Sequence, residues 1–225
     1  MNNIRIAIDG PSGAGKSTLA RSLAAKLGIL YVDTGAIYRT IGYQIYTQGL
    51  DPKDAAAVDG ELPRIQVEAV HGDDGLQHMI LNGRDVTQEI RLPEISLYAS
   101  AVSAHPSVRA YLLDMQRQLA RTQSVIMDGR DIGTVVLPDA EVKIFLTASP
   151  EVRARRLMLE LEQRGTPEPY DQVLAEIQKR DWDDSNRAIS PLRQAEDAVR
   201  LDTTDLDFQE SEEALMRIIR ERTGL

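Results

Sequence analysis

Residues 10–17 read GPSGAGKS and match the pattern G-x-x-x-x-G-K-[ST]. Glycines at these positions let successive backbone N–H groups turn inward and surround phosphate oxygens without obstruction by side chains. A lysine after the last glycine can reach the β- and γ-phosphates of a nucleoside triphosphate, and the next hydroxyl can ligate Mg²⁺. We therefore predict that Lys16 binds phosphate and that Ser17 holds Mg²⁺ in a nucleoside triphosphate site.

Arginines beside hydroxyls and carboxylates recur through the rest of the chain. They are Arg39 in DTGAIYR, Arg109 in HPSVR, Arg130 in DGRD, and Arg180 and Arg187 in KRDWDDSNR. Any one of them alone is most simply a solvated surface residue. Arg130, however, follows an apolar run, and open α/β sheets bind ligands at the carboxyl ends of their strands. The set predicts a small anion as second substrate, held by bidentate guanidinium contacts.

The N-terminal part of the chain shows a strand–helix–strand pattern. Residues 4–9 form an apolar run typical of a buried strand. A helix follows from Lys16, with apolar residues at spacing four, and Gly28 is typical of its end. Residues 29–32 predict a second strand, so the segment is a βαβ unit and implies a parallel sheet with helices on its faces.

Later segments extend this sheet and interrupt it. Apolar runs at 124–127 and 142–146 predict further strands, and 196–202 predicts a return strand. Runs at 65–70 and 76–81 flank HGDDG and predict an inserted antiparallel hairpin. Helical patterns cover 93–121, with a break at Pro106, and Ser149 and Pro150 are typical of a helix start. Two charged helices, 152–163 and 172–187, hinged near Gly165 and Pro167, suit a lid that excludes water.

Composition narrows the class of protein. The chain has 225 residues, 42% of them hydrophobic and 27% charged, with a net charge of −9. This charge argues against general affinity for nucleic acid or anionic membranes, because the long-range field repels polyanions. The absence of cysteine excludes disulfides and thiolate metal sites. The apolar run at 4–8 is too short for a signal peptide or a membrane span, and we expect a monomeric cytoplasmic protein.

A phosphate-binding loop alone indicates only nucleotide binding, which is common to several classes of protein. A GTPase needs a guanine-reading N-K-x-D segment after a later strand, and the sequence has none. A transport or motor ATPase normally has more chain and a strand that ends in a paired acidic motif. Two alternatives stay open: a kinase for another acceptor, such as UMP or a hydroxylated metabolite, and a regulatory module switched by ATP occupancy. A hydroxyl acceptor would need a general base, so the arginines favour a phosphorylated acceptor.

Four segments carry a family resemblance. DGPSGAGKST, DTGAIYR, DGRDIGTVVLPDAEVKIFL and RDWDDSNRAISPL resemble blocks of the bacterial cytidylate kinases, which are P-loop nucleoside monophosphate kinases. The likeness runs from Ile4 to about Asp205, and the hairpin at 65–81 resembles the insertion of the bacterial enzymes. It implies transfer of the γ-phosphoryl group of ATP to CMP or dCMP, giving ADP and CDP or dCDP, in pyrimidine metabolism.

The resemblance also implies a fold and a domain plan. It implies a single P-loop kinase domain over residues 1–225, an α/β fold with a central parallel sheet flanked by helices. The core would be about 1–35, 120–150 and 188–225, the helical lid about 151–187, and the nucleoside monophosphate-binding insertion, with its antiparallel hairpin, about 36–119.

Site residues carry over position by position. The resemblance places ATP on Arg156, in the lid, and on the loop residues Gly10, Pro11, Ser12, Gly13, Ala14, Gly15, Lys16, Ser17 and Thr18, with Mg²⁺ as cofactor. It places CMP on Ser12, Thr34, Arg39, Ser100, Arg109, Arg130, Asp131, Arg180, Asp184 and Arg187. Ser100, Arg109 and Asp131 would read cytosine, and Asp184, with Arg187, would face the ribose. Arg39, Arg130 and Arg180 would face the monophosphate and, with Lys16, be catalytic. Thr34 departs from the serine typical of the family but keeps the hydroxyl.

The chemistry of these residues suits the implied reaction. Cytosine presents an amino donor next to acceptors, so an Asp–Arg pair distinguishes it from uracil, whose pattern is reversed. A phosphate nucleophile is already anionic at neutral pH and needs no base. Asp128 could hold a Mg²⁺-bound water or make a structural hydrogen bond, and Asp33 could cap a helix or position Arg39. The preference between CMP and dCMP, the donor preference and the role of the hairpin stay open.

Overall fold

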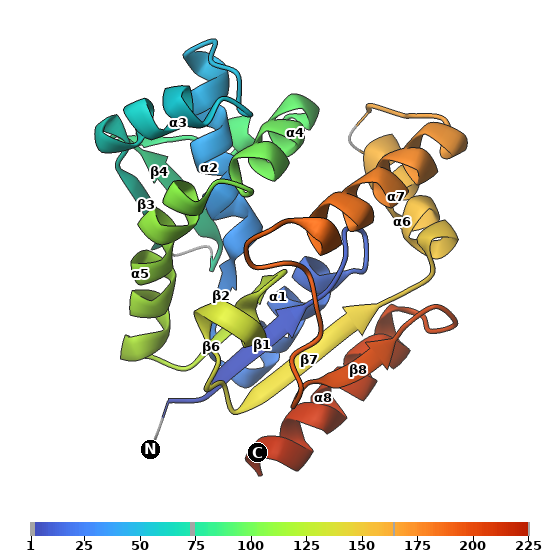
Figure 1. The fold of residues 1–225 in the computed structure, drawn as a ribbon. Coiled ribbons are helices and arrows are strands. Elements are labelled where there is room, and N and C mark those ends of the chain that lie inside the picture. Colours follow the sequence, from blue (N-terminus) through green and yellow to red (C-terminus); the bar gives the residue numbers. More distant parts are fainter. Residues whose placement is uncertain (1–2, 73–74, 164, 225) are drawn as a thin grey trace. The chain divides into compact units, whose positions relative to one another are not determined.

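The computed structural model describes residues 3–72, 75–163 and 165–224, which fold into two compact units (Figure 1). The first unit lies within Met1–Tyr31 and Ala120–Leu225, and the second lies within Val32–Leu119. The boundary falls inside the strand β2 (Leu30–Asp33), whose last two residues belong to the second unit, and each unit is described by itself below.

The first unit is built on a five-stranded sheet with the order β2-β6-β1-β7-β8. Its strands are β1 (Arg5–Asp9), β2 (Leu30–Asp33), β6 (Val125–Gly129), β7 (Val142–Thr147) and β8 (Val199–Asp202). Strand β1 pairs in parallel with β6 and β7, and β7 pairs in parallel with β8. The predicted parallel sheet and the predicted return strand are therefore confirmed.

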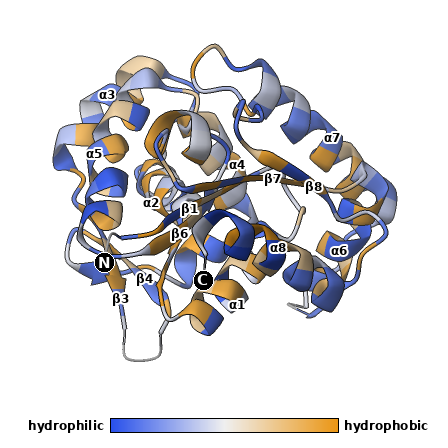
Figure 2. Ribbon diagram, turned by 90° about the horizontal axis from the view of Figure 1, so that it is seen from below, coloured by the Kyte–Doolittle hydropathy of each residue, from blue (hydrophilic) through white to orange (hydrophobic). Residues whose placement is uncertain are grey.

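The strands β1 and β6 at the centre of this sheet are buried along almost their whole length, which explains their apolar sequences. Helices α1 (Lys16–Leu27) and α8 (Phe208–Thr223) pack together beside β1, β6 and β7. Their shared core includes Ile6, Ile126, Leu23 and Leu215, all fully buried. Figure 2 shows the hydrophobic residues that run along the central strands. Strands buried on two faces read as continuous apolar runs, which is why the sequence pattern located them.

The remaining helices of this unit form a pair with a small core of its own. Helices α6 (Pro150–Gln163) and α7 (Tyr170–Asn186) pack around Ala154, Val173 and Ile177. Ser149 Oγ accepts from Val152 N at 3.3 Å, so the predicted cap is confirmed. A single π-helical turn, η3 (Ile132–Val136), follows β6. In the part of the chain that the structure describes, no helix is long and apolar enough to cross a membrane.

The second unit combines helices with a three-stranded antiparallel sheet. Strands β3 (Val67–His71) and β4 (Gln77–Leu81) form the predicted hairpin, and the short strand β5 (Arg84–Asp85) adds an edge that the sequence pattern did not reveal. A strand of two exposed polar residues has no periodicity to detect. Of the predicted turn HGDDG, residues 73–74 lie outside the described residues.

The helices of the second unit follow the predicted breaks in the chain. They are α2 (Thr34–Thr47), α3 (Ala55–Glu61), the 3-10 turns η1 (Leu62–Arg64) and η2 (Glu89–Arg91), α4 (Pro93–Val102) and α5 (Pro106–Thr122), which ends just past the unit. Helices α2 and α4 make the densest contact. Gly42 permits it, because a Cβ atom there would lie 2.8 Å from the backbone nitrogen of Ala99.

Candidate active site

The predicted phosphate-binding loop joins the end of β1 to the start of α1. Gly10, Gly13 and Gly15 all have positive φ angles, of 154°, 73° and 85°. A Cβ atom at Gly10 would overlap the carbonyl oxygen of Leu146 on β7, so this position requires glycine. No side chain among the described residues caps the N-terminus of α1 at Gly15. The first N–H groups of α1 are thereby left to an anion.

Lys16 lies inside this loop and is buried. Its Nζ donates to the carbonyl oxygen of Pro11 at 2.7 Å. The pKa of Lys16 is lowered from 10.5 to about 7, chiefly by burial and also by the charge of Arg130, against the opposing effect of the carboxylates of Asp128 and Asp184. A triphosphate at the loop would favour the charged lysine, because it would supply the negative charge that the buried ammonium lacks.

Ser17 and Asp128 meet at the start of α1. Ser17 Oγ donates to Asp128 Oδ2 at 2.9 Å, and the hydroxyl of Tyr31 donates to Asp128 Oδ1, also at 2.9 Å. A hydroxyl and a carboxylate beside a phosphate loop are oxygen ligands of the kind that Mg²⁺ prefers, and such sites use one or two protein oxygens together with substrate phosphates. These residues therefore fit Mg²⁺. Across the described residues, no group of three or more His, Asp or Glu side chains gathers as a metal site.

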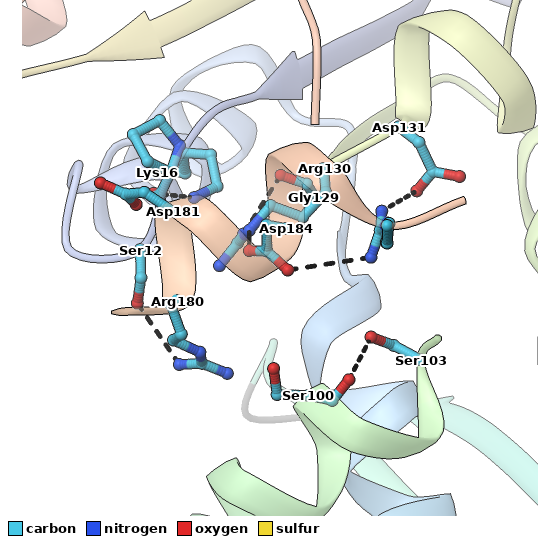
Figure 3. Close-up of polar contacts among 12 residues, drawn as sticks. Ser12, Lys16, Ser100, Ser103, Gly129, Arg130, Asp131, Arg180, Asp181 and Asp184 are labelled. Atoms are coloured by element: carbon cyan, nitrogen blue, oxygen red, sulfur yellow. Dashed lines mark hydrogen bonds and ion pairs between the residues drawn. The ribbon is translucent and has the colours of Figure 1, made fainter. Parts of the chain in front are cut away.

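Two arginines and two aspartates form an ion-pair network in the first unit (Figure 3). Arg130, directly after β6, donates from Nε to Asp184 Oδ2 on α7 at 2.7 Å. Arg187 lies 3.8 Å from the other oxygen of Asp184 and 3.9 Å from Asp131. Burial by itself would raise the pKa of Asp184, but Arg130, Arg180 and Arg187 together lower it below its ordinary value. Asp184 is therefore charged at neutral pH.

Arg180 and Arg153 connect the helix pair to the phosphate loop. Arg180 Nη1 lies 3.4 Å from Ser12 Oγ, and Figure 3 shows the two side chains pointing toward each other. Arg153 is buried and donates to the carbonyl oxygens of Ser12 at 2.9 Å and Ala148 at 2.8 Å. Its Nη2 also pairs with Asp181 Oδ2 at 2.6 Å. Sequence reasoning missed Arg153, because nothing in a charged helix distinguishes one buried arginine from its exposed neighbours.

Asp9 supports the segment that carries Arg130 and Asp131. Its two carboxylate oxygens accept from the backbone nitrogens of Ile132 and Gly133, each at 2.7 Å. Burial raises the pKa of Asp9 to about 6, and those two hydrogen bonds oppose the shift. Asp9 thus fixes η3 at the end of β1. Sequence reasoning missed it as well, because an aspartate at the end of a strand is an ordinary residue.

In the second unit, Asp33 performs both of the roles that the sequence left open. Its Oδ1 accepts from Ala36 N at 2.8 Å and so caps α2, which begins at the buried Thr34. Its Oδ2 pairs with Arg39 at 3.0 Å and with Arg91 at 3.4 Å. The Nε of Arg39 is buried and lacks a hydrogen-bond partner among the described residues. Arg91 was not predicted, since the surrounding segment EIRL matches no binding or catalytic motif.

Arg109 and Ser100, the other predicted residues of this unit, lie on α5 and α4. Arg109 is buried, donates to the carbonyl oxygen of Ser103 at 3.0 Å and stacks its guanidinium 5.4 Å from the ring centre of Tyr38. The carbonyl oxygen of Ser100 accepts from Ser103 Oγ at 2.8 Å. Hydrogen bonding and cation–π contact therefore hold the Arg109 side chain in place.

Arg156 lies at a different place in the first unit. Its guanidinium donates to Oγ1 of Thr203 at 3.1 Å and to the carbonyl oxygen of Thr203 at 2.7 Å, just after β8. Partial burial lowers its pKa. The part that Arg156 takes in ATP binding stays a prediction.

Comparison with known proteins gives one consistent family. Residues 6–221 match the family model described as cytidylate kinase. A cytidylate kinase of Caldicellulosiruptor bescii is 50% identical over 93% of this chain and 92% of its own. One from Mycobacterium leprae is 48% identical over 100% of this chain and 99% of its own. The fold resembles an uncharacterized protein from Eubacterium ventriosum, with a TM-score of 0.53 and 13% identity over 98% of this chain and 100% of that one.

Proposed function

Since the chain belongs to the cytidylate kinase family, we propose that it transfers the γ-phosphoryl group of ATP to CMP or dCMP. The products are ADP and CDP or dCDP. The observation that best supports this reaction is the contact between Arg180 and Ser12. A guanidinium that could hold an acceptor phosphate thus contacts the loop that we propose binds the donor phosphates, which supports transfer between two bound phosphates.

The donor side of the reaction uses the phosphate loop. Its backbone N–H groups and the start of α1 bind the β- and γ-phosphates, and Lys16 turns from Pro11 towards them. Ser17 and Asp128 would hold Mg²⁺, which when bound neutralises charge on the phosphates. Arg153 keeps the loop in place through the carbonyl oxygen of Ser12.

The acceptor side of the reaction uses Arg39, Arg130 and Arg180. The acceptor phosphate carries its own negative charge, so it attacks without a general base, and the main barrier is repulsion between two anions. The three guanidinium groups offset this repulsion and align the attacking oxygen with the γ-phosphorus. Asp184 holds Arg130 by its Nε, which fixes the direction of the remaining N–H groups.

Selectivity for cytosine is assigned to Asp131 and Arg109, with Ser100. A carboxylate accepts from the amino group of cytosine, and a guanidinium donates to the adjoining ring nitrogen and carbonyl. Uracil reverses the first two of these positions and would leave a buried charge unpaired. Asp184, with Arg187, is assigned to the ribose, and Thr34 supplies a hydroxyl at the acceptor. A closing lid at 151–187, Arg156 on ATP, a monomer and a cytoplasmic location remain our predictions.

The variants Asp131→Asn and Arg109→Met test this assignment. We expect each to lower kcat/KM for CMP by roughly a hundredfold or more, as when a buried polar partner of a substrate is lost, and to reduce the preference for CMP over UMP. The preference is measured as the ratio of kcat/KM for the two acceptors. A regulatory module switched by ATP would show no dependence on the acceptor and no effect of either variant.

A further inference from the structure

Gln77 makes two hydrogen bonds to a single residue of the second unit. It lies on β4, and its side chain is buried. Its Oε1 accepts from the backbone nitrogen of Asp33 at 2.9 Å, and its Nε2 donates to the carbonyl oxygen of Asp33 at 3.1 Å. The same Nε2 also lies 3.1 Å from the sulfur of Met79. One side-chain amide therefore satisfies both backbone groups of Asp33.

These contacts replace a missing neighbour strand. Strand β2 is the outermost strand of its sheet, and its peptides point alternately to either side. The nitrogen of Leu30 donates to Ser124, just before β6, so Asp33, three residues later, faces the open side. Buried backbone groups need partners, and Gln77 supplies them from the inserted hairpin. Gln77 thus fixes the backbone of Asp33 from the hairpin of the same unit, without strand pairing.

Asp33 connects the backbone that Gln77 holds to two arginine side chains. Its carboxylate caps α2 at Ala36 and pairs with Arg39 and Arg91. The Asp33 carboxylate and the Arg39 guanidinium pack closely against Gly35. A Cβ atom at Gly35 would lie 3.1 Å from Asp33 Oδ1 and 3.4 Å from Arg39 Nη1. A shift of the Asp33 backbone therefore moves the carboxylate and the guanidinium groups bound to it.

We propose that Gln77 is a positioning residue for the acceptor phosphate, and that the three-stranded sheet acts on the reaction through it. The inference rests on the proposed function, in which Arg39 binds that phosphate. Gln77 touches neither substrate. It fixes the backbone of Asp33, which aligns Arg39 and Arg91. The three-stranded sheet therefore affects the binding of the acceptor and does not affect the binding of ATP.

The test compares Gln77→Leu with a matched control, Leu81→Val, in the full-length chain. Leu81 is buried on the same strand, so its truncation weakens the same sheet without touching Asp33. Loss of two buried hydrogen bonds predicts that Gln77→Leu raises KM for CMP roughly tenfold and leaves KM for ATP within about twofold. Leu81→Val should lower Tm and leave KM for CMP within about twofold of wild type.

A double-mutant cycle with Asp33→Asn shows whether Gln77 acts through Asp33. When the carboxylate is already absent, Gln77→Leu should raise KM for CMP much less than it does in the wild type. Equal effects in the two backgrounds would overturn the proposal. So would a Gln77→Leu variant that lowers Tm but keeps the wild-type KM for CMP, or one that raises KM for ATP and CMP equally.

The wild type, assayed first with several nucleoside monophosphates, separates this proposal from the proposed function. Turnover of another monophosphate in place of CMP would overturn the base assignment alone, and the same KM comparison with that acceptor would still test Gln77. No turnover with any monophosphate would overturn both proposals.

Discussion

Arg130 donates from Nε to Asp184 Oδ2 at 2.7 Å, in a pair that is largely withdrawn from solvent. The two residues come from distant parts of the chain, the segment after β6 and the helix α7. Asp184 also lies beside Arg187, which in turn lies beside Asp131. Each aspartate therefore compensates the charge of an arginine before any substrate is bound, and holds that guanidinium in one orientation.

Removal of Asp184 should leave Arg130 with an uncompensated buried charge. We expect Asp184→Ala to lower the free energy of unfolding by about 2–4 kcal/mol, as breaking a buried pair does, and to raise KM for CMP. Urea denaturation and steady-state kinetics measure the two effects. Asp183→Ala is the matched control. Asp183 is the residue next to Asp184 on α7, is exposed, and makes a long ion pair of 3.5 Å with Lys179. It should change the stability by less than about 0.5 kcal/mol, and equal losses in both variants would contradict the role of the network.

The pKa of Lys16 predicts how the stability of the nucleotide-free chain depends on pH. Burial lowers the pKa of the folded lysine to about 7, from 10.5 for the ordinary side chain. Between these values the unfolded chain binds more protons than the folded chain, so the contribution of Lys16 to stability increases as the pH rises from 7 to 10.5. Below pH 7 both states hold the proton and the penalty for the buried charge is complete.

Lys16→Met tests this dependence. The variant should be more stable than wild type at pH 7 in the absence of nucleotide, and the difference should shrink towards pH 10. The free energy of unfolding from urea denaturation at several pH values measures it. Lys53→Met, at an exposed lysine, provides the control and should show no such trend. A constant difference between Lys16→Met and wild type across this range would show that the buried lysine keeps its ordinary pKa.

We expect replacement of Gly42 by alanine to lower the free energy of unfolding, although Gly42 lies within a helix. Alanine favours a helix over glycine by about 1 kcal/mol, so propensity alone predicts that Gly42→Ala stabilises α2. The new Cβ atom would lie 2.8 Å from the backbone nitrogen of Ala99, and α4 would have to move. We expect a net loss of about 1–3 kcal/mol in the free energy of unfolding. Gly60→Ala on α3, where a Cβ atom would meet no atom within 4 Å, should not lower the stability, and a similar loss there would contradict the packing argument.

Much of the fold could be predicted from the sequence, for identifiable reasons. Strands β1 and β6 read as nearly continuous apolar runs because almost all of their residues are buried, and Gly28, Ser149 and Pro150 mark helix boundaries by local stereochemistry. The loop around Lys16 was evident because phosphate binding by backbone groups requires glycines at fixed positions. Such features depend on near neighbours in the chain.

The residues that escaped prediction act across long separations. Asp9 binds the backbone of Ile132, Arg153 binds that of Ser12, and Gln77 binds that of Asp33. A side chain that bonds to distant backbone atoms leaves no pattern, because the backbone partner has no sequence identity. Their roles became evident only from the folded structure.

ADP release from Mg·ATP, measured with CMP, dCMP, UMP, AMP and GMP offered separately, distinguishes the proposed reaction from its alternatives. A cytidylate kinase with the site described here should turn over CMP and dCMP rapidly and the other three much more slowly. Turnover with UMP equal to or faster than that with CMP would contradict the assignment of Asp131 and Arg109 to the base. ADP release that no acceptor accelerates would contradict the kinase function itself and favour a nucleotide-binding module.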